Sequence, residues 1–248
     1  MMAHGTLLGS YFFHDMIPWD DEVDLLVDYN DYPRLKKVFH NQTLWSKYQL
    51  YGQKDSTNEY EFDLLNKVFP DNDPEPVLKT KVKERNRIRY HLVKIFSPKA
   101  KETRYPWKWP FIDVAFFKYN GNHFWNHDKI QKYSMPLKHF FPFHLRPFMG
   151  MWLPAPHKTS LILKQYLLRN GGDAHGLKCR MGNYDHKAEK EINEIDRVEV
   201  PCSSLNSVYV NIIRSKLDNG KTNESAFLSG KLLYSTYVDE NFDDVSLN

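Results

Sequence analysis

Two short apolar segments carry carboxylates at positions where burial is expected, and they constrain the fold more than any other feature of the chain. The segment EVDLLV (22–27) follows an acidic run and has turn residues before and after it, as a strand does. The segment WPFIDVAFFKY (109–119) is a second buried-strand pattern, with Asp113 in its middle. Aromatic residues make up 15% of the chain, which suits a sheet better than a helical bundle. The sequence therefore predicts an α/β (or α+β) fold, with a sheet flanked by helices.

Capping residues and apolar periodicity predict helices around these strands. They cover residues 5–14, a segment capped by Asn30 or Asp31, residues 158–169 and the charged segment 186–197. A further short apolar element lies at 60–69, and NRIRYHLVKIF (86–96) alternates like a half-exposed strand. No repeat, low-complexity tract or linker is visible. We expect one domain over 1–248, with a catalytic core at about 5–190 and a C-terminal extension at about 191–248.

Charge is distributed unevenly along the chain. Residues 79–104 hold ten Lys and Arg against two Glu, a net +8, whereas the whole chain carries +3. Such a segment indicates an anionic ligand or a membrane surface, and a solvated charged hairpin is an equally good interpretation. Arg87, Arg89 and, further along, Arg146 are candidates for phosphate contacts. The modest overall charge and the lack of a recognition motif argue against nucleic acid as a partner.

Sequence signals for cellular location are sparse. No apolar stretch approaches the roughly 18–20 residues that a membrane span requires, and the first residues do not follow a signal-peptide pattern. Cys179 and Cys202 could form one bridge in an oxidising compartment or remain free. Glycosylation sequons at Asn41 and Asn223 favour a secretory location only weakly, because such short motifs often arise by chance.

The acids of the two strands predict a metal site. Glu22 and Asp24 are two residues apart, so a strand points both side chains to one face. With Asp113 on a neighbouring strand, three carboxylates would repel one another unless a cation lay among them. Mg²⁺ or Mn²⁺ fits, because hard cations prefer oxygen ligands and share their coordination shell with substrate phosphates. The alternatives are a solvated turn around Asp21 and an Asp113 that pairs with a buried arginine.

The glycines near the first residue add a possible phosphate site. The segment GTLLGS opens a helix whose first amide groups would face an anion. Its candidate phosphate-binding residues are Gly5, Thr6, Gly9 and Ser10. A phosphate held there would lie close to a metal bound by Glu22 and Asp24.

These motifs together resemble the LicD family, which includes the fukutin and fukutin-related proteins. The resemblance rests on GTLLGSYFFHDMIPWDDEVDLLV, on WPFIDVAFF and, more weakly, on RPFMGMWLPAPHKTSLILKQYL (146–167). It implies a nucleotidyltransferase fold and transfer of a phospho-alcohol, such as phosphocholine or ribitol phosphate, from a CDP-activated donor to a glycan hydroxyl. It also implies Glu22, Asp24 and Asp113 as metal ligands, with Asp20 and Asp21 as supporting acids. Asp113 would hold a second metal or accept the proton of the acceptor.

The chain departs from the family pattern in three places. Glu22 stands where the family most often has Asp, and Phe12 where it usually has Arg. Only four residues precede Gly5, whereas the family has a helix and a strand there, so we expect the first core strand to be missing and an edge to be left unpaired. A membrane anchor would have to lie upstream, and the resemblance implies the Golgi or ER lumen. A non-catalytic glycan- or partner-binding protein and a transferase of NMP are the alternative functions.

Overall fold

The computed structural model describes residues 1–39, 49–52, 93–104, 107–119, 121–126, 135–169 and 178–240. Arg87, Arg89 and the apolar segment 60–69 lie outside these ranges, as does the sequon at Asn41. The predictions for those residues therefore stay predictions.

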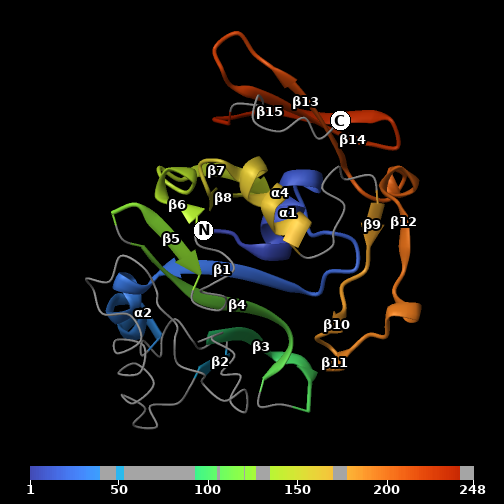
Figure 1. The fold of residues 1–248 in the computed structure, drawn as a ribbon. Helices are drawn as coiled ribbons and strands as arrows, with labels where there is room; N and C mark the ends of the chain where they lie inside the picture. The colour runs from blue at the N-terminus through green and yellow to red at the C-terminus, as the bar shows by residue number, and fades with distance from the viewer. Residues whose placement is uncertain are drawn as a thin grey trace.

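A mixed sheet forms the centre of the molecule (Figure 1). Its strands run in the order β2-β3-β4-β5-β6, and β1 pairs with β4. The bounds are β1 Glu22–Asp28, β2 Gln49–Gly52, β3 Val93–Glu102, β4 Lys108–Tyr119, β5 His123–Asn126 and β6 Met135–Pro136. The β1–β4 pair is parallel and the other pairs are antiparallel. Both predicted buried strands are present, and the α/β fold class is confirmed.

Helices cover the sheet and join its strands. They are α1 His4–Phe13, α2 Tyr32–Phe39 and α4 Thr159–Arg169, with short 3-10 turns at Tyr29–Asp31, Leu137–His139, Glu194–Asp196 and Cys202–Leu205. His14 caps the C-terminal end of α1: its backbone is left-handed (φ 54°), and its N–H donates to the Gly9 carbonyl. Leu7 and Tyr11 of α1 join Leu26 of β1 in the main apolar core, so α1 lies fixed on one face of the sheet.

The first three residues lie along the open side of β1. Met2 forms an antiparallel bridge with Leu25, and the Leu26 amide donates to the Met1 carbonyl at 2.8 Å. The Met2 amide donates to the carbonyl of Pro154 at 2.8 Å. Among the described strands, β1 pairs only with β4, and its other edge is met by this isolated bridge around Leu25.

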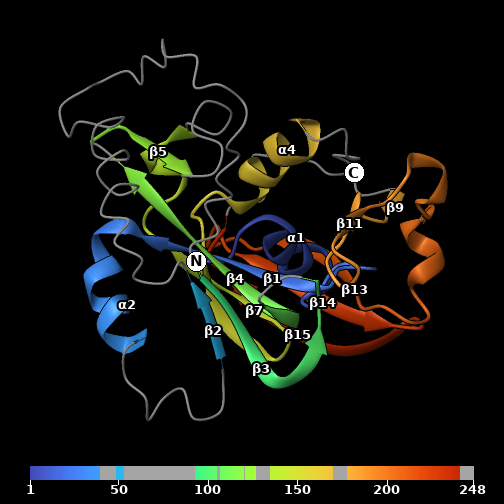
Figure 2. The ribbon, with the colours of Figure 1, turned by 90° about the horizontal axis from the view of Figure 1, so that it is seen from below.

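Two ribbons follow the sheet. A hairpin of β7 His144–Phe148 and β8 Met151–Ala155 precedes α4. The second ribbon, here called the arm (residues 178–202), pairs β9 Lys178–Arg180 with β12 Glu199–Pro201, and β10 Tyr184–Asp185 with β11 Lys190–Glu191. A disulfide joins Cys179 to Cys202 at the base of the arm. Figure 2 shows the arm and α2 at opposite ends of the sheet.

The predicted helix at 186–197 was wrong. The segment forms the tip of the arm, its second short strand and a 3-10 turn. Glu189, with a left-handed backbone (φ 52°), turns the chain there, and its side chain is 1% exposed. The charge periodicity of the segment indicated an exposed helix, but contacts with distant parts of the chain outweigh such a local preference.

A three-stranded antiparallel sheet ends the described chain. It consists of β13 Asn211–Lys216, β14 Thr222–Leu228 and β15 Lys231–Val238, and β13 contacts α1 (Figure 1). None of the helices in the described ranges has the length and apolar character to cross a membrane.

Candidate metal and phosphate site

The register of three strands places the site residues in one row across the sheet. Asp24 of β1 lies beside Asp113 of β4, and Asp113 lies opposite Lys94 of β3. Neighbouring residues in a sheet share a face, so all three side chains point the same way. Glu22, two residues before Asp24, points to the same face and lies beside Phe111. The predicted same-face arrangement of Glu22 and Asp24 follows from this pairing.

Three carboxylates meet closely enough to share a cation. Glu22, Asp24 and Asp113 each offer an oxygen within 4.8 Å of the others. Asp24 is 8% exposed and Asp113 is 2% exposed, so water screens their charges poorly. Within the described residues, the buried atoms Oε2 of Glu22 and Oδ2 of Asp20 have no hydrogen-bond partner. Carboxylate oxygens that are buried and unpaired fit a hard divalent cation.

The electrostatics of the cluster point the same way. Burial raises the pKa of Glu22 well above its ordinary range, and the charges of Asp24 and Asp113 raise it further. Burial, followed by the charge of Asp24, raises the pKa of Asp20 to about 7. The site thus holds more negative charge than its surroundings neutralise, and a bound cation would relieve that excess.

Lys94 is the cation that the structure places in the cluster. Its Nζ donates to both oxygens of Asp113, at 2.6 and 2.8 Å, and lies 3.6 Å from the centre of the Phe111 ring. From the sequence, Lys94 belongs to the basic, half-exposed strand that was expected to bind an anionic ligand such as the donor pyrophosphate. The structure instead buries it at 8% exposure, in the row with Asp113 and Asp24. Lys94 therefore pairs with both oxygens of Asp113 and offsets part of the negative charge of the cluster.

The start of α1 supports the acids. The Asp24 amide donates to Thr6 Oγ1 at 2.7 Å, which ties α1 to β1. A Cβ atom on Gly5 would lie 2.6 Å from Asp20 Oδ2, so the absence of a side chain lets Asp20 approach the first helical turn. Gly5 and Thr6 therefore border the site, where the first amides of a helix favour an anion.

Gly9 and Ser10 have structural roles instead. A Cβ atom on Gly9 would collide with the Asp15 carbonyl and lie 3.0 Å from the Ile17 nitrogen. Ser10 is fully buried, and its hydroxyl donates to the Pro147 carbonyl at 2.8 Å. The prediction that these two residues bind phosphate was wrong, because both face the protein interior around the turn after α1.

Arg146 lies in a different buried centre. It is 0% exposed, and its guanidinium donates to Glu224 Oε1 at 2.7 Å and to Glu240 Oε2 at 3.0 Å. Glu224 also contacts His14 Nε2 at 2.7 Å and accepts from Arg214 Nε at 2.8 Å. Burial alone would raise the pKa of Glu224, but Arg146 and Arg214 outweigh it and hold that pKa well below its usual range. The prediction of Arg146 as a phosphate ligand was therefore wrong.

Sequence reasoning missed His186, which reaches the cluster from the tip of the arm. Its Nδ1 lies 2.7 Å from Asp21 Oδ1 and its Nε2 lies 3.2 Å from Glu22 Oε1. A lone histidine in a charged segment about 165 residues downstream carries no local signal of this contact. Asp21, predicted as an acid supporting the metal, contacts His186 of the arm through both of its carboxylate oxygens.

The family comparison agrees with this site. The model of the LicD/FKTN/FKRP nucleotidyltransferase domain matches residues 1–68 and 76–158, more than half of the chain. The match includes β1 with Glu22 and Asp24, and β4 with Asp113, while the arm and the C-terminal sheet lie outside it. No curated protein matches the chain. The extent of the family match, together with the acids that it covers, shows that this chain belongs to the LicD family.

Proposed function

We propose that the chain is a divalent-metal-dependent transferase that moves a phospho-alcohol from a CDP-activated donor to a glycan hydroxyl. The observation that carries the proposal is the convergence of Glu22, Asp24 and Asp113, whose oxygens lie within 4.8 Å of one another. Membership of the LicD family supports a transferase of this general kind. The unpaired buried oxygens of Glu22 and Asp20 support the metal.

Glu22, Asp24 and Asp113 would hold one or two Mg²⁺ or Mn²⁺ ions, with Asp20 beside them. When bound, such ions neutralise phosphate charge and polarise the reacting oxygens. The first amides of α1, at Gly5 and Thr6, would face the donor pyrophosphate, because they lie next to Asp20 and Asp24. Lys94 adds a fixed positive charge at the same face. These groups position an anionic donor without having to reorganise.

The reaction is an in-line displacement at the phosphorus that carries the alcohol. The acceptor hydroxyl oxygen forms a bond to this phosphorus, and the bond from the phosphorus to the bridging pyrophosphate oxygen breaks. CMP leaves with that oxygen and its electron pair, and the hydroxyl proton passes to a carboxylate of the cluster. Such chemistry depends mostly on positioning and charge stabilisation, which is what a preorganised, buried acidic site provides.

We also propose that the protein works in the secretory pathway. The disulfide between Cys179 and Cys202 supports this, because disulfides persist mainly in oxidising compartments.

Product analysis tests the reaction. The purified chain, Mn²⁺, CDP-ribitol or CDP-choline and a glycan acceptor are followed by phosphorus NMR, and we expect CMP and a phosphodiester product. Asp24→Asn and Asp113→Asn should each lower the rate roughly a thousandfold or more. Asp28→Asn is the matched control, since Asp28 lies on the same strand but outside the carboxylate cluster.

The alternative functions give different results. Release of pyrophosphate would indicate transfer of NMP and would overturn the reaction type. A folded chain that binds no CDP ligand in the presence of Mn²⁺, measured by calorimetry, would indicate a non-catalytic binding protein.

A further inference from the structure

We propose that His186 is a positioning residue of the active site and that the arm, which lies outside the family match, is part of that site. His186 would hold Glu22 in the orientation that binds the metal, with Asp21 as the anchor of the arm. The proposal rests on the proposed metal-dependent function and adds a residue and an element to it.

Three contacts join His186 to the acids before and at the start of β1. Nδ1 lies 2.7 Å from Asp21 Oδ1, and the His186 backbone amide donates to Asp21 Oδ2 at 3.2 Å. Nε2 lies 3.2 Å from Glu22 Oε1. Both oxygens of Asp21 are thus engaged by one residue, which suits an anchor better than a metal ligand.

Neighbouring groups fix the orientation of the imidazole ring. The ring lies edge-on to Phe111, with 5.9 Å between centroids and 88° between planes, and it contacts Tyr184 at 4.9 Å. Phe111 is the β4 neighbour of Glu22, so the same strand pair that places the carboxylate also places the ring. A side chain locked in this way can orient its partner with little entropic cost.

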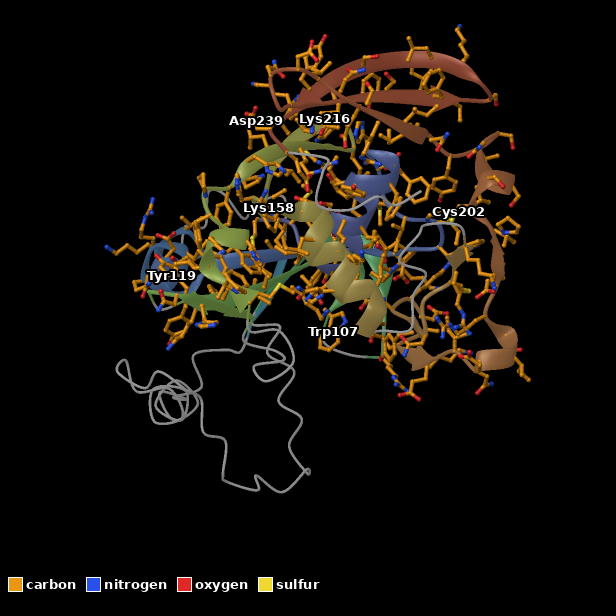
Figure 3. The ribbon with its side chains drawn as sticks, turned by 45° about the horizontal axis from the view of Figure 1, so that its top comes forward. Trp107, Tyr119, Lys158, Cys202, Lys216 and Asp239 are labelled. Carbon is orange, nitrogen blue, oxygen red and sulfur yellow. A yellow bond between two sulfur atoms is a disulfide. The ribbon has the colours of Figure 1, made fainter. Side chains whose placement is uncertain are left out.

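The tip of the arm is held firmly against the end of the sheet. Glu189 Oε1 accepts from Trp107 Nε1 at 2.6 Å, and Glu189 Oε2 accepts from the Tyr184 hydroxyl at 3.1 Å. Arg104 donates to the Glu189 carbonyl. The disulfide of Cys202 closes the base of the arm, away from Trp107 (Figure 3). The arm therefore presents His186 as a fixed group.

The two carboxylate oxygens of Glu22 have different surroundings. Oε1 faces His186, whereas Oε2 is buried without a partner among the described residues. An outer group that holds one oxygen of a ligating carboxylate leaves the other aimed at the metal. Loss of such an outer partner typically weakens metal affinity 10- to 100-fold.

Binding of Mn²⁺ in the absence of donor, measured by electron paramagnetic resonance on the full chain, tests the proposal. We expect His186→Ala to raise the dissociation constant for Mn²⁺ roughly 10- to 100-fold. His186→Gln should recover part of the affinity, since its amide can donate to Asp21. In turnover, His186→Ala should raise the Mn²⁺ concentration needed for half-maximal rate more than it lowers the rate at saturating Mn²⁺. Lys190→Ala, an exposed change on the same arm, is the control and should leave affinity unchanged.

The outcomes separate this proposal from the function on which it rests. Wild-type affinity in both His186 variants would overturn the positioning role while leaving the metal site intact. A wild-type chain that binds no Mn²⁺ would overturn the proposed metal dependence, and His186 with it. A chain that binds Mn²⁺ but transfers nothing from CDP donors would contradict the proposed reaction, and the affinity comparison would still decide the role of His186. If His186→Ala does not fold, the Mn²⁺ affinity of His186→Gln tests the proposal on its own. An affinity equal to that of the wild type in His186→Gln would then overturn the positioning role.

Discussion

At the scale of single residues, Gly9 shows how a glycine motif can serve packing rather than phosphate binding. Glycine inside a helix ordinarily costs about 1 kcal/mol relative to alanine. In α1, however, a Cβ atom at this position would collide with the backbone of the turn at Asp15–Ile17. That turn leads the chain from α1 back to the acids of β1. A residue without a side chain is therefore needed at position 9 for the turn to pack this closely against α1.

We therefore expect Gly9→Ala to destabilise the protein by about 2 kcal/mol or more, in the range of an overpacked interior. Urea unfolding followed by circular dichroism measures the change. Gly182→Ala is the control, because a Cβ atom there would meet nothing closer than 4.0 Å and the backbone angle is unstrained. A Gly9→Ala variant as stable as the control would contradict the packing role.

At the scale of elements, a buried ionic centre attaches the C-terminal sheet to the rest of the molecule. Glu224 of β14 contacts His14 at the end of α1, Arg146 of β7 and Arg214 of β13. Glu240, after β15, accepts from Arg146 and from the Ser160 amide at the start of α4 at 2.7 Å. Groups from α1, β7, β13 and α4 thus contact these two carboxylates. Each buried charge in this centre is neutralised by its neighbours.

Glu224→Gln should destabilise the protein by about 3–5 kcal/mol, because it leaves two arginines with one buried carboxylate fewer. The midpoint of urea unfolding measures the loss. Glu199→Gln, which breaks an ion pair to Lys178 with both side chains exposed, should cost less than about 1 kcal/mol. Equal effects of the two substitutions would show that the buried centre adds nothing beyond a surface pair.

The elements also show what could be predicted from the sequence. Strands β1 and β4 were predictable because their apolar runs are local, and the two-residue spacing of Glu22 and Asp24 fixes their shared face. Lys94 belongs to the basic segment expected to bind an anionic ligand, but its place beside Asp113 depends on strand register. His186 was not predictable as a site residue, because the fold of the arm brings it there. Arg146 was misassigned because its partners Glu224 and Glu240 lie 78 and 94 residues away. Local pattern thus identifies the acids, and long-range pairing decides what surrounds them.

At the scale of the whole molecule, two buried charged centres differ in their balance. The centre around Glu224 pairs its carboxylates with arginines. The centre around Glu22 gathers four acids against Lys94 and His186, and two of its buried oxygens have no partner within the described residues. Stability and function therefore oppose each other at the second centre: the acids that would bind a cation repel one another without it.

This opposition predicts that Glu22→Gln stabilises the metal-free protein. Removing one carboxylate removes the cost of burying it, which is the larger effect, and its repulsion with Asp24 and Asp113. The amide can keep the contact with His186. We expect the free energy of unfolding to rise by about 0.5–2 kcal/mol. For a chain of this size, each kcal/mol raises Tm by roughly 2–4 °C. Differential scanning calorimetry in EDTA measures this change in stability.

Addition of Mn²⁺ at about 100 times its dissociation constant should then stabilise the wild type by about 2.7 kcal/mol. The variant should gain much less stability, because only the wild type retains all three proposed ligands. A variant less stable than wild type in EDTA would show that the acids do not repel one another, and an equal response of both proteins to Mn²⁺ would remove Glu22 from the metal site.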